Sequence, residues 1–117
     1  MTTRIVIAEA VDTLAVARRK ARTVRVDWPR DRRAGFYNLQ VFRGKRKVVS
    51  VFPRADRRQV RLRAGRYRVV VWSGVGAMRR GRYAPRPWVN RFVTVRPART
   101  ASARARPVVL RVRSSRG

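Results

Sequence analysis

Arginine and aromatic side chains gather in one stretch of the sequence, between residues 72 and 88. Guanidinium groups match the geometry of phosphate and carboxylate oxygens, and aromatic rings can stack on nucleic-acid bases. This composition suits a polyanion, either nucleic acid or a sulfated or uronic polysaccharide. The candidate binding residues are Arg79, Arg80, Arg82, Tyr83, Arg86, Trp88 and Trp72.

The two tryptophans of this stretch have a second interpretation. Tyr67, Val69 and Val71 alternate along one face of a predicted strand, and Trp72 falls on the opposite face. Its side chain should therefore point away from the main core. Trp88 ends the arginine-rich loop. Both rings could instead pack against arginine stems or form a subunit contact. The sequence leaves these alternatives open.

Two further basic groups form a secondary patch. One group precedes the first clear strand, and the other lies at a predicted hairpin tip. A charged hairpin tip is usually a solvated turn, and it can also deter edge-to-edge pairing of sheets. The residues of the secondary patch are Arg18, Arg19, Lys20, Arg22, Lys45, Arg46 and Lys47.

The composition removes most enzyme chemistry. The 117 residues include no Cys and no His, and the acidic residues are Glu9, Asp12, Asp27, Asp31 and Asp56. Cysteine nucleophiles, serine–histidine dyads and Cys/His zinc sites are therefore excluded, and paired catalytic carboxylates nearly so. We expect a protein that is not an enzyme and needs no cofactor or metal.

The charge points to an anionic partner. Lys and Arg number 32 against 5 Asp and Glu, which gives a formal net charge of +27. Such a charge on one small domain repels itself, so the compact state would gain from a polyanion. Because no base-reading motif is visible, binding of nucleic acid should tolerate any sequence. A genome that favours Arg codons would also raise the arginine content, and the sequence does not separate these causes.

The hydropathy pattern predicts an all-β fold. Val occurs 20 times and Leu 4 times, which favours strands because β-branched side chains suit a pleated surface. Short alternating segments are separated by turn residues, and no space remains for crossover helices. We predict an antiparallel β-sandwich of about seven strands, near residues 24–28, 36–43, 46–52, 60–63, 67–72, 89–95 and 107–113.

The chain divides into a central sandwich and two ends. Residues 1–21 form an N-terminal extension or first strand, residues 22–96 form the sandwich, and residues 97–117 form an Arg/Ala-rich linker with a possible C-terminal strand. The C-terminal segment could be a basic arm that orders along a polyanion. It could also add a strand to an open sheet edge, either its own or a neighbour's.

Residues 24–95 resemble a fibronectin type III domain. The resemblance rests on Val-Asp-Trp-Pro at 26–29, the strand with Tyr at 37–41, the Leu…Gly-x-Tyr-x-Val segment at 62–69 and the closing strand at 92–95. It implies an immunoglobulin-like sandwich in which the Tyr67 hydroxyl bonds back to the backbone. It also implies a non-catalytic binding or spacer module, commonly extracellular. The long Arg-rich loop after residue 74 departs from the family pattern.

Two functions follow from these features. The first is a basic β-sandwich module that binds a polyanion, most simply nucleic acid. The alternative is a structural or adhesive subunit of a surface or particle assembly, joined through its terminal strands. No apolar run approaches the ~20 residues of a membrane span. The absence of a recognisable signal peptide suggests the cytoplasm, whereas the family resemblance suggests the cell surface, so the compartment stays open.

Overall fold

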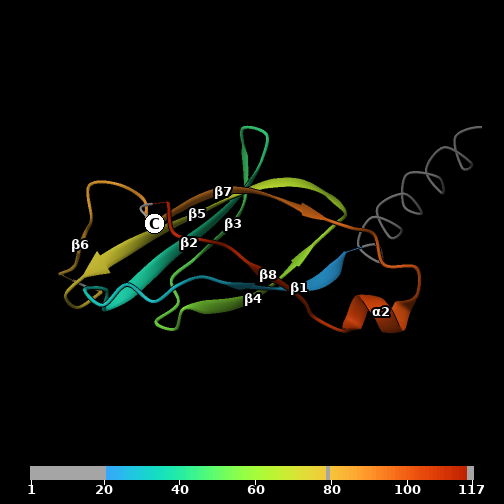
Figure 1. The fold of residues 1–117 in the computed structure, drawn as a ribbon, viewed down its shortest axis with the longest axis horizontal. Helices are drawn as coiled ribbons and strands as arrows, with labels where there is room; N and C mark the ends of the chain where they lie inside the picture. Colours follow the sequence, from blue (N-terminus) through green and yellow to red (C-terminus); the bar gives the residue numbers. More distant parts are fainter. Residues whose placement is uncertain (1–20, 79, 116–117) are drawn as a thin grey trace, which may run out of the picture.

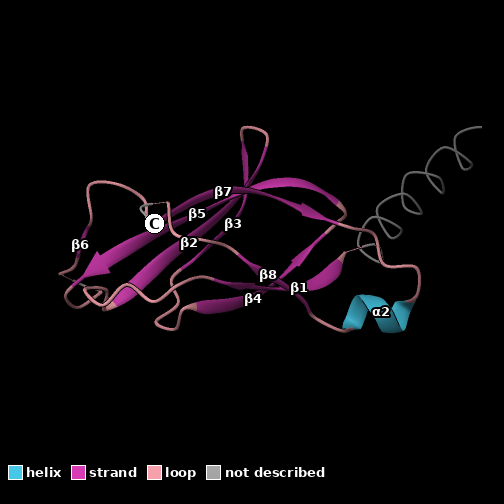
Figure 2. Cartoon of the chain, viewed as in Figure 1, coloured by secondary structure: helices cyan, strands magenta, loops and turns pink. Residues whose placement is uncertain are grey.

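The computed structural model describes residues 21–78 and 80–115, and the regular secondary structure of this part of the chain is almost entirely β-strand (Figures 1 and 2). One short helix, α2, joins the last two strands. The elements are β1 (Arg22–Asp27), β2 (Phe36–Arg43), β3 (Arg46–Val51), β4 (Arg57–Leu62), β5 (Gly65–Val75), β6 (Arg82–Tyr83), β7 (Val89–Val95), α2 (Ala101–Ala105) and β8 (Val108–Arg111).

The strands form two sheets that pack as a sandwich, which confirms the predicted fold class. A three-stranded sheet has the order β4-β1-β8, and a five-stranded sheet has the order β3-β2-β5-β6 with β7 also paired to β5. β6 and β7 occupy successive parts of the same edge of β5, at Gly74–Val75 and at Gly65–Val71. Pairing is antiparallel throughout except between β1 and β8, which run parallel.

The core lies between the two sheets and follows the alternation of the sequence. Val24 and Val26 of β1 face Leu39 of β2 and Val69 and Val71 of β5, and all five side chains are fully buried. Since successive strand residues point to opposite faces, the intervening positions of β2 and β5 lie on the outer face of the five-stranded sheet. We call this solvent-facing side of the five-stranded sheet the outer face.

Tyr37 links the core to the turn after β1. Its buried ring meets Trp28 edge to face, with ring centroids 5.4 Å apart. Its hydroxyl oxygen accepts a hydrogen bond of 2.9 Å from the backbone N–H of Asp31. Burial raises the pKa of the Tyr37 hydroxyl above its usual value of 10.0, while the Asp31 N–H and the Arg30 guanidinium oppose part of that rise. Folding therefore favours the neutral phenol.

Tyr67 makes the contact that the resemblance implies. Its hydroxyl donates a hydrogen bond of 2.7 Å to the carbonyl oxygen of Arg63, four residues earlier. Its ring is buried in the core, so the bond ties the loop before β5 to the sandwich. This tyrosine corner is a property of β-sandwiches. Membership of the fibronectin type III family stays a prediction.

The C-terminal segment returns to the sandwich and pairs within its own chain. β8 lies beside β1 with Val24 opposite Val108 and Val26 opposite Leu110. The buried Val112 follows, and its N–H donates to the Asp27 carbonyl at 2.9 Å. The linker holds α2, a single helical turn capped by the Thr100 side chain, where the sequence predicted no element. The expected N-terminal strand or extension, with Arg18, Arg19 and Lys20, falls outside the described residues except for Ala21.

We expect Tyr37→Phe to lower the free energy of unfolding by about 1–2 kcal/mol at neutral pH, because the buried Asp31 N–H loses its acceptor. Urea unfolding measures this change. Tyr83→Phe is the matched control, since that ring is 44% exposed and should change stability little.

The same pair of variants tests the ionisation of Tyr37. A pKa that folding raises gives stability that is present below the unfolded value of 10.0 and is lost as the pH rises further. The advantage of wild type over Tyr37→Phe should therefore shrink as the pH rises from 10.0 through the folded-state pKa. A difference that stays constant across this range would contradict the assigned environment.

Candidate functional site

The arginine-rich loop of residues 76–87 is held against the outer face at one end of the sandwich. Phe36, at the start of β2, is buried there and lies outside the main core. Gly74 and Gly81 pack directly on its ring, since a Cβ atom at either position would lie within 2.5 Å of it. The Tyr83 ring meets the Phe36 ring edge to face at 5.7 Å. These contacts fix the loop where the sequence alone showed a long connection.

Backbone hydrogen bonds close the same loop. The Gly35 N–H donates to the Gly74 carbonyl at 2.9 Å, and the Ala84 N–H donates to the Ser73 carbonyl at 2.9 Å. β6 pairs with β5 at Gly74 and Val75, next to the Ala84–Ser73 bond, at the left of Figure 1. Gly76 turns the chain with a φ of +86°, a conformation that favours glycine. The loop residues are therefore placed by sheet pairing.

Two hollows meet at Tyr83. The first, of about 450 Å³, is lined by Asp31, Arg33, Val75, Arg80, Arg82, Tyr83, Ala84 and Pro85. The second, of about 350 Å³, is lined by Asn38, Gln40, Trp72 and Tyr83. One hollow thus offers guanidinium groups and the other offers rings and amides. A ligand that crossed Tyr83 would contact both.

Asp31 is the acidic residue of the first hollow. Burial alone would raise its pKa, but the Arg33 backbone N–H, the Ser73 hydroxyl and the Arg33 guanidinium together outweigh burial and hold the pKa below its usual 3.8. The Arg33 Nε lies 3.5 Å from the Asp31 carboxylate. The carboxylate is therefore charged at neutral pH and engaged with Arg33, which leaves Arg80 and Arg82 for an external anion.

The structure brings together part of the predicted binding set. Arg80, Arg82 and Tyr83 line the first hollow, and Tyr83 and Trp72 line the second. Trp72 points away from the core, as its parity predicted, and lies opposite Asn38 in the register. Arg86 is exposed in the following turn. Arg79 is outside the described residues.

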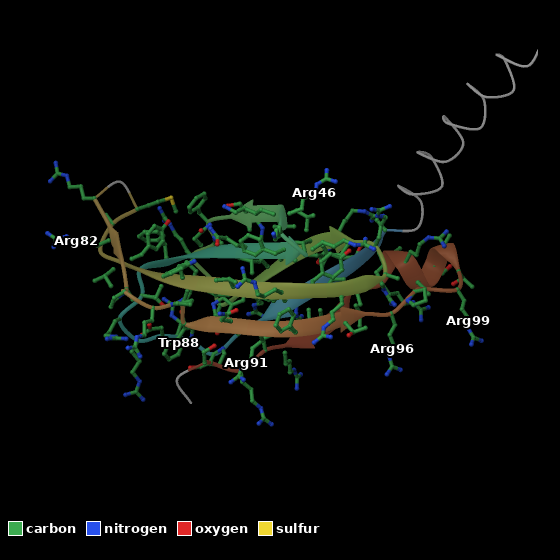
Figure 3. All side chains as sticks on the ribbon, turned by 90° about the horizontal axis from the view of Figure 1, so that it is seen from above. Arg46, Arg82, Trp88, Arg91, Arg96 and Arg99 are labelled. Atoms are coloured by element: carbon green, nitrogen blue, oxygen red, sulfur yellow. The ribbon has the colours of Figure 1, made fainter. Side chains whose placement is uncertain are left out.

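Trp88 is engaged in packing. It lies half-buried against the core, and its indole Nε1–H donates to the Pro29 carbonyl at 2.7 Å. Its backbone N–H also donates to the Val71 carbonyl at 2.8 Å. Figure 3 shows it on the flank of the sandwich, away from Arg82 at the end. Trp88 therefore ties the end of the loop to the sandwich, a contact that differs from both alternatives the sequence offered, arginine stems and a subunit contact.

The described part of the secondary basic patch is divided between the sheets. Lys45 lies at the β2–β3 turn, where the hairpin tip was predicted, and Arg46 and Lys47 begin β3. Arg22 begins β1 in the other sheet and donates from Nη1 to the Arg96 carbonyl at 3.0 Å. These residues do not form one surface with Arg22.

Most of the positive charge is left without an acidic partner. Within residues 21–78 and 80–115 two ion pairs are present, Arg25–Asp27 at 2.9 Å and Arg33–Asp31 at 3.5 Å. Figure 3 shows Arg82 and Arg99 near opposite ends of the molecule, with Arg46 and Arg91 on opposite flanks. The electrostatic field is therefore positive on all sides of the molecule. A binding site must be recognised by its local geometry and not by its charge alone.

The sequence pattern missed a set of residues that only the sheet register brings together. Asn38 and Gln40 join Trp72 at the second hollow, and Phe42 and Phe92 lie on the same outer face beside arginines. The sequence did show that these residues alternate with the core residues and therefore face away from the core. Which residues lie opposite one another depends on strand pairing, which no single segment encodes.

These features define a highly basic, all-β sandwich with an arginine-lined and aromatic-lined surface at one end of its larger sheet. Comparisons with protein families, with curated proteins and with solved structures find no match to the chain. Across residues 21–78 and 80–115, the structure has no helix with the length and apolar character of a membrane span.

We expect Gly81→Ala to destabilise the protein by about 1–3 kcal/mol, because the added methyl group would overlap the buried Phe36 ring. Urea unfolding gives the change in free energy. Ala77→Ser, at an exposed position of the same loop, is the control and should stay within about 0.5 kcal/mol of wild type. Equal stability of Gly81→Ala and wild type would show that the loop does not rest on Phe36.

Proposed function

We propose that this chain is a non-catalytic binding module for a polyanion, most simply nucleic acid, which it binds without sequence preference. The observation that carries the proposal is the grouping of Arg80, Arg82, Tyr83 and Trp72 around two adjoining hollows on a protein of net charge +27. Such a surface offers both cations for phosphates and rings for bases.

The unpaired arginines support this proposal energetically. Each exposed guanidinium is solvated and surrounded by like charges, so a polyanion relieves repulsion as it binds. Binding also releases the counterions condensed on the polyanion, which is the main source of affinity in sequence-independent nucleic-acid binding. An arginine fork can hold two phosphate oxygens at once. Positive charge surrounds the molecule, but β6 fixes the positions of Arg82 and Tyr83, so the loop can bind the polyanion at a defined place.

The fold supports a binding role of the kind that the fibronectin type III resemblance implies. Trp28 and Tyr37 pack in the core and Tyr67 bonds to the Arg63 carbonyl, as the resemblance predicts. We propose that the chain is a divergent member of this family whose extended loop after β5 carries the binding residues. The function itself is argued from the surface, because one fold serves many functions.

Replacing Arg80 and Arg82 together with Gln should weaken binding of a fluorescent oligonucleotide by about tenfold or more at low salt. It should also reduce the slope of log K against log salt, by about 0.7 for each phosphate contact that is lost on a single strand. Fluorescence anisotropy across a salt series gives both values.

The matched control is Arg57→Gln with Arg58→Gln, two exposed positions at the start of β4 that change the net charge by the same amount. If both pairs weaken binding equally, net charge is responsible and the loop is not a site. Binding that does not change with salt concentration would contradict the polyanion proposal altogether.

A structural or adhesive subunit is the second candidate, and β8 is the feature that favours it. β8 is a short edge strand held by parallel pairing to Val24–Asp27, at the end of a linker. The same pairing made with a neighbouring chain would join two copies without any new contact.

Protein purified from its native host separates the two candidates. An absorbance excess at 260 nm that nuclease removes and high salt releases is expected for the nucleic-acid module. A large particle that is free of nucleic acid and survives high salt would instead favour the structural subunit. Size-exclusion chromatography with light scattering and absorbance detection reports both outcomes in one experiment.

A further inference from the structure

The outer face carries a row of alternating cations and rings that runs across four strands. Lys47 of β3 lies opposite Phe42 of β2, Phe42 lies opposite Arg68 of β5, and Arg68 lies opposite Phe92 of β7. A β-bulge between Val41 and Phe42 shifts the register and brings Lys47 into line. We call these four residues the cross-strand row.

Phe42 contacts both cations of the row, and Arg66, two residues before Arg68, contacts Phe92. The Arg68 Cζ lies 4.8 Å from the centroid of the Phe42 ring, and the Lys47 Nζ lies 5.8 Å from the same centroid. The Arg66 Cζ lies 4.9 Å from the centroid of the Phe92 ring. Cation–π contacts of this kind hold each guanidinium or ammonium group over a ring. The cations are thus already positioned next to the rings.

Phe92 is the most exposed large apolar side chain that the structure describes, at 65%. A phenyl ring left in water forgoes the stabilisation that its burial would give. A hollow of about 560 Å³ borders the ring and is lined by Gly44, Arg66, Tyr67, Arg68 and Phe92. The ring therefore stands beside open space with two guanidinium groups around it.

The two faces of the sandwich differ in aromatic content although both are basic. The outer positions of the three-stranded sheet include Arg25, Arg57, Arg61, Val109 and Arg111, and no aromatic side chain occurs in β1, β4 or β8. The outer face of the five-stranded sheet carries Phe36, Phe42, Trp72, Tyr83 and Phe92. A requirement for positive charge alone does not explain this difference.

We propose that the cross-strand row stacks unpaired bases, so that the outer face binds single-stranded nucleic acid. Phe42 and Phe92 supply the stacking rings, and Arg66, Arg68 and Lys47 contact the phosphates between the bases. This inference rests on the proposed function and names the class of polyanion. The candidate site lies on the same face, since Trp72 is four residues beyond Arg68 on β5, about 13 Å along the strand.

The geometry favours a single strand over a duplex. Phe42 and Phe92 are two strands apart on the sheet, so their Cα positions are separated by about 10 Å. Bases in a duplex are stacked on each other and present no free faces, whereas the bases of a single strand can separate onto individual rings. A sulfated polysaccharide offers the same charges but has no planar base for a phenyl ring to stack on.

Phe92→Ala tests the inference without altering the net charge. The probes are a labelled oligothymidine of about 15 nucleotides, within the range that one OB-fold covers, a duplex of equal length, inorganic polyphosphate and heparin. Phe92→Ala and Phe42→Ala should each weaken oligothymidine binding about fivefold or more and leave polyphosphate and heparin binding unchanged. The salt slope should stay at the wild-type value, because no phosphate contact is removed.

Phe52→Ala is the matched control, because Phe52 is also exposed, at 50%, but lies in the loop after β3, outside the row. It should leave binding of every probe unchanged, and urea unfolding should show all three variants folded. Wild type should bind oligothymidine more tightly than the duplex.

The remaining outcomes distinguish failure of this inference from failure of the proposed polyanion-binding function. If wild type binds all the polyanions and Phe92→Ala changes none of them, the polyanion function stands and base stacking is wrong. If Phe92→Ala weakens heparin as much as oligothymidine, the face does not recognise bases and the inference is wrong. If wild type binds none of the probes at low salt, the proposed function fails and the inference fails with it.

Discussion

The register of β2 and β7 on β5 is the constraint on which both the core and the surface depend. Pairing Leu39 with Val71 and Tyr67 with Val93 places the apolar side chains against the other sheet. The same pairing places Arg68 between Phe42 and Phe92 on the outer face. A slip of one residue would turn every side chain of a strand to the opposite face, so burial of the core also fixes the surface. The strand register that buries the core therefore also positions the rings and cations of the row.

A small core has to tolerate an unusually large charge. The fully buried side chains are mainly valines with Tyr37 and Leu39, and they are held by two sheets rather than by ion pairs. Exposed ion pairs would add little in any case, about 0–1 kcal/mol each. Repulsion is instead reduced by distributing guanidinium groups around the molecule and over aromatic rings. Several of these rings are on the surface, which links the tolerance of charge to the surface proposed for binding.

The sequence predicted the sandwich because alternation and turn residues are local signals. The outward direction of Trp72 followed from such signals, whereas the hydrogen bond of Tyr67 was implied by the resemblance to fibronectin type III domains, and the structure contains both features. The strand β6 and the helical turn α2 were not predicted, because each is only a few residues long and depends on what it packs against. The parallel pairing of β8 with β1 was also beyond local signals, since the sequence left open whose edge this strand would join.

The candidate site was predictable in composition but not in arrangement. Arg80, Arg82 and Tyr83 were identified because they cluster in the chain, and Trp72 because of its parity. Trp88 belongs to the same stretch of sequence. Its indole N–H, however, donates a hydrogen bond to the carbonyl of Pro29, which lies 59 positions earlier in the chain. The cross-strand row was missed for the same reason: its members lie on four strands, and the β-bulge beside Phe42 decides which of them meet.

Arginine content by itself cannot locate a site in such a protein, because codon usage would spread arginines over every surface. The structure has this property, with Arg57, Arg61 and Arg111 on the three-stranded sheet and Arg66 and Arg68 on the five-stranded sheet. Codon bias toward arginine does not explain why Phe42, Trp72 and Phe92 all project from one face. A sheet that needed only solubility would carry polar residues there, since exposed rings forgo their burial energy. The position of the rings, more than the number of arginines, therefore identifies the face that a ligand would cover.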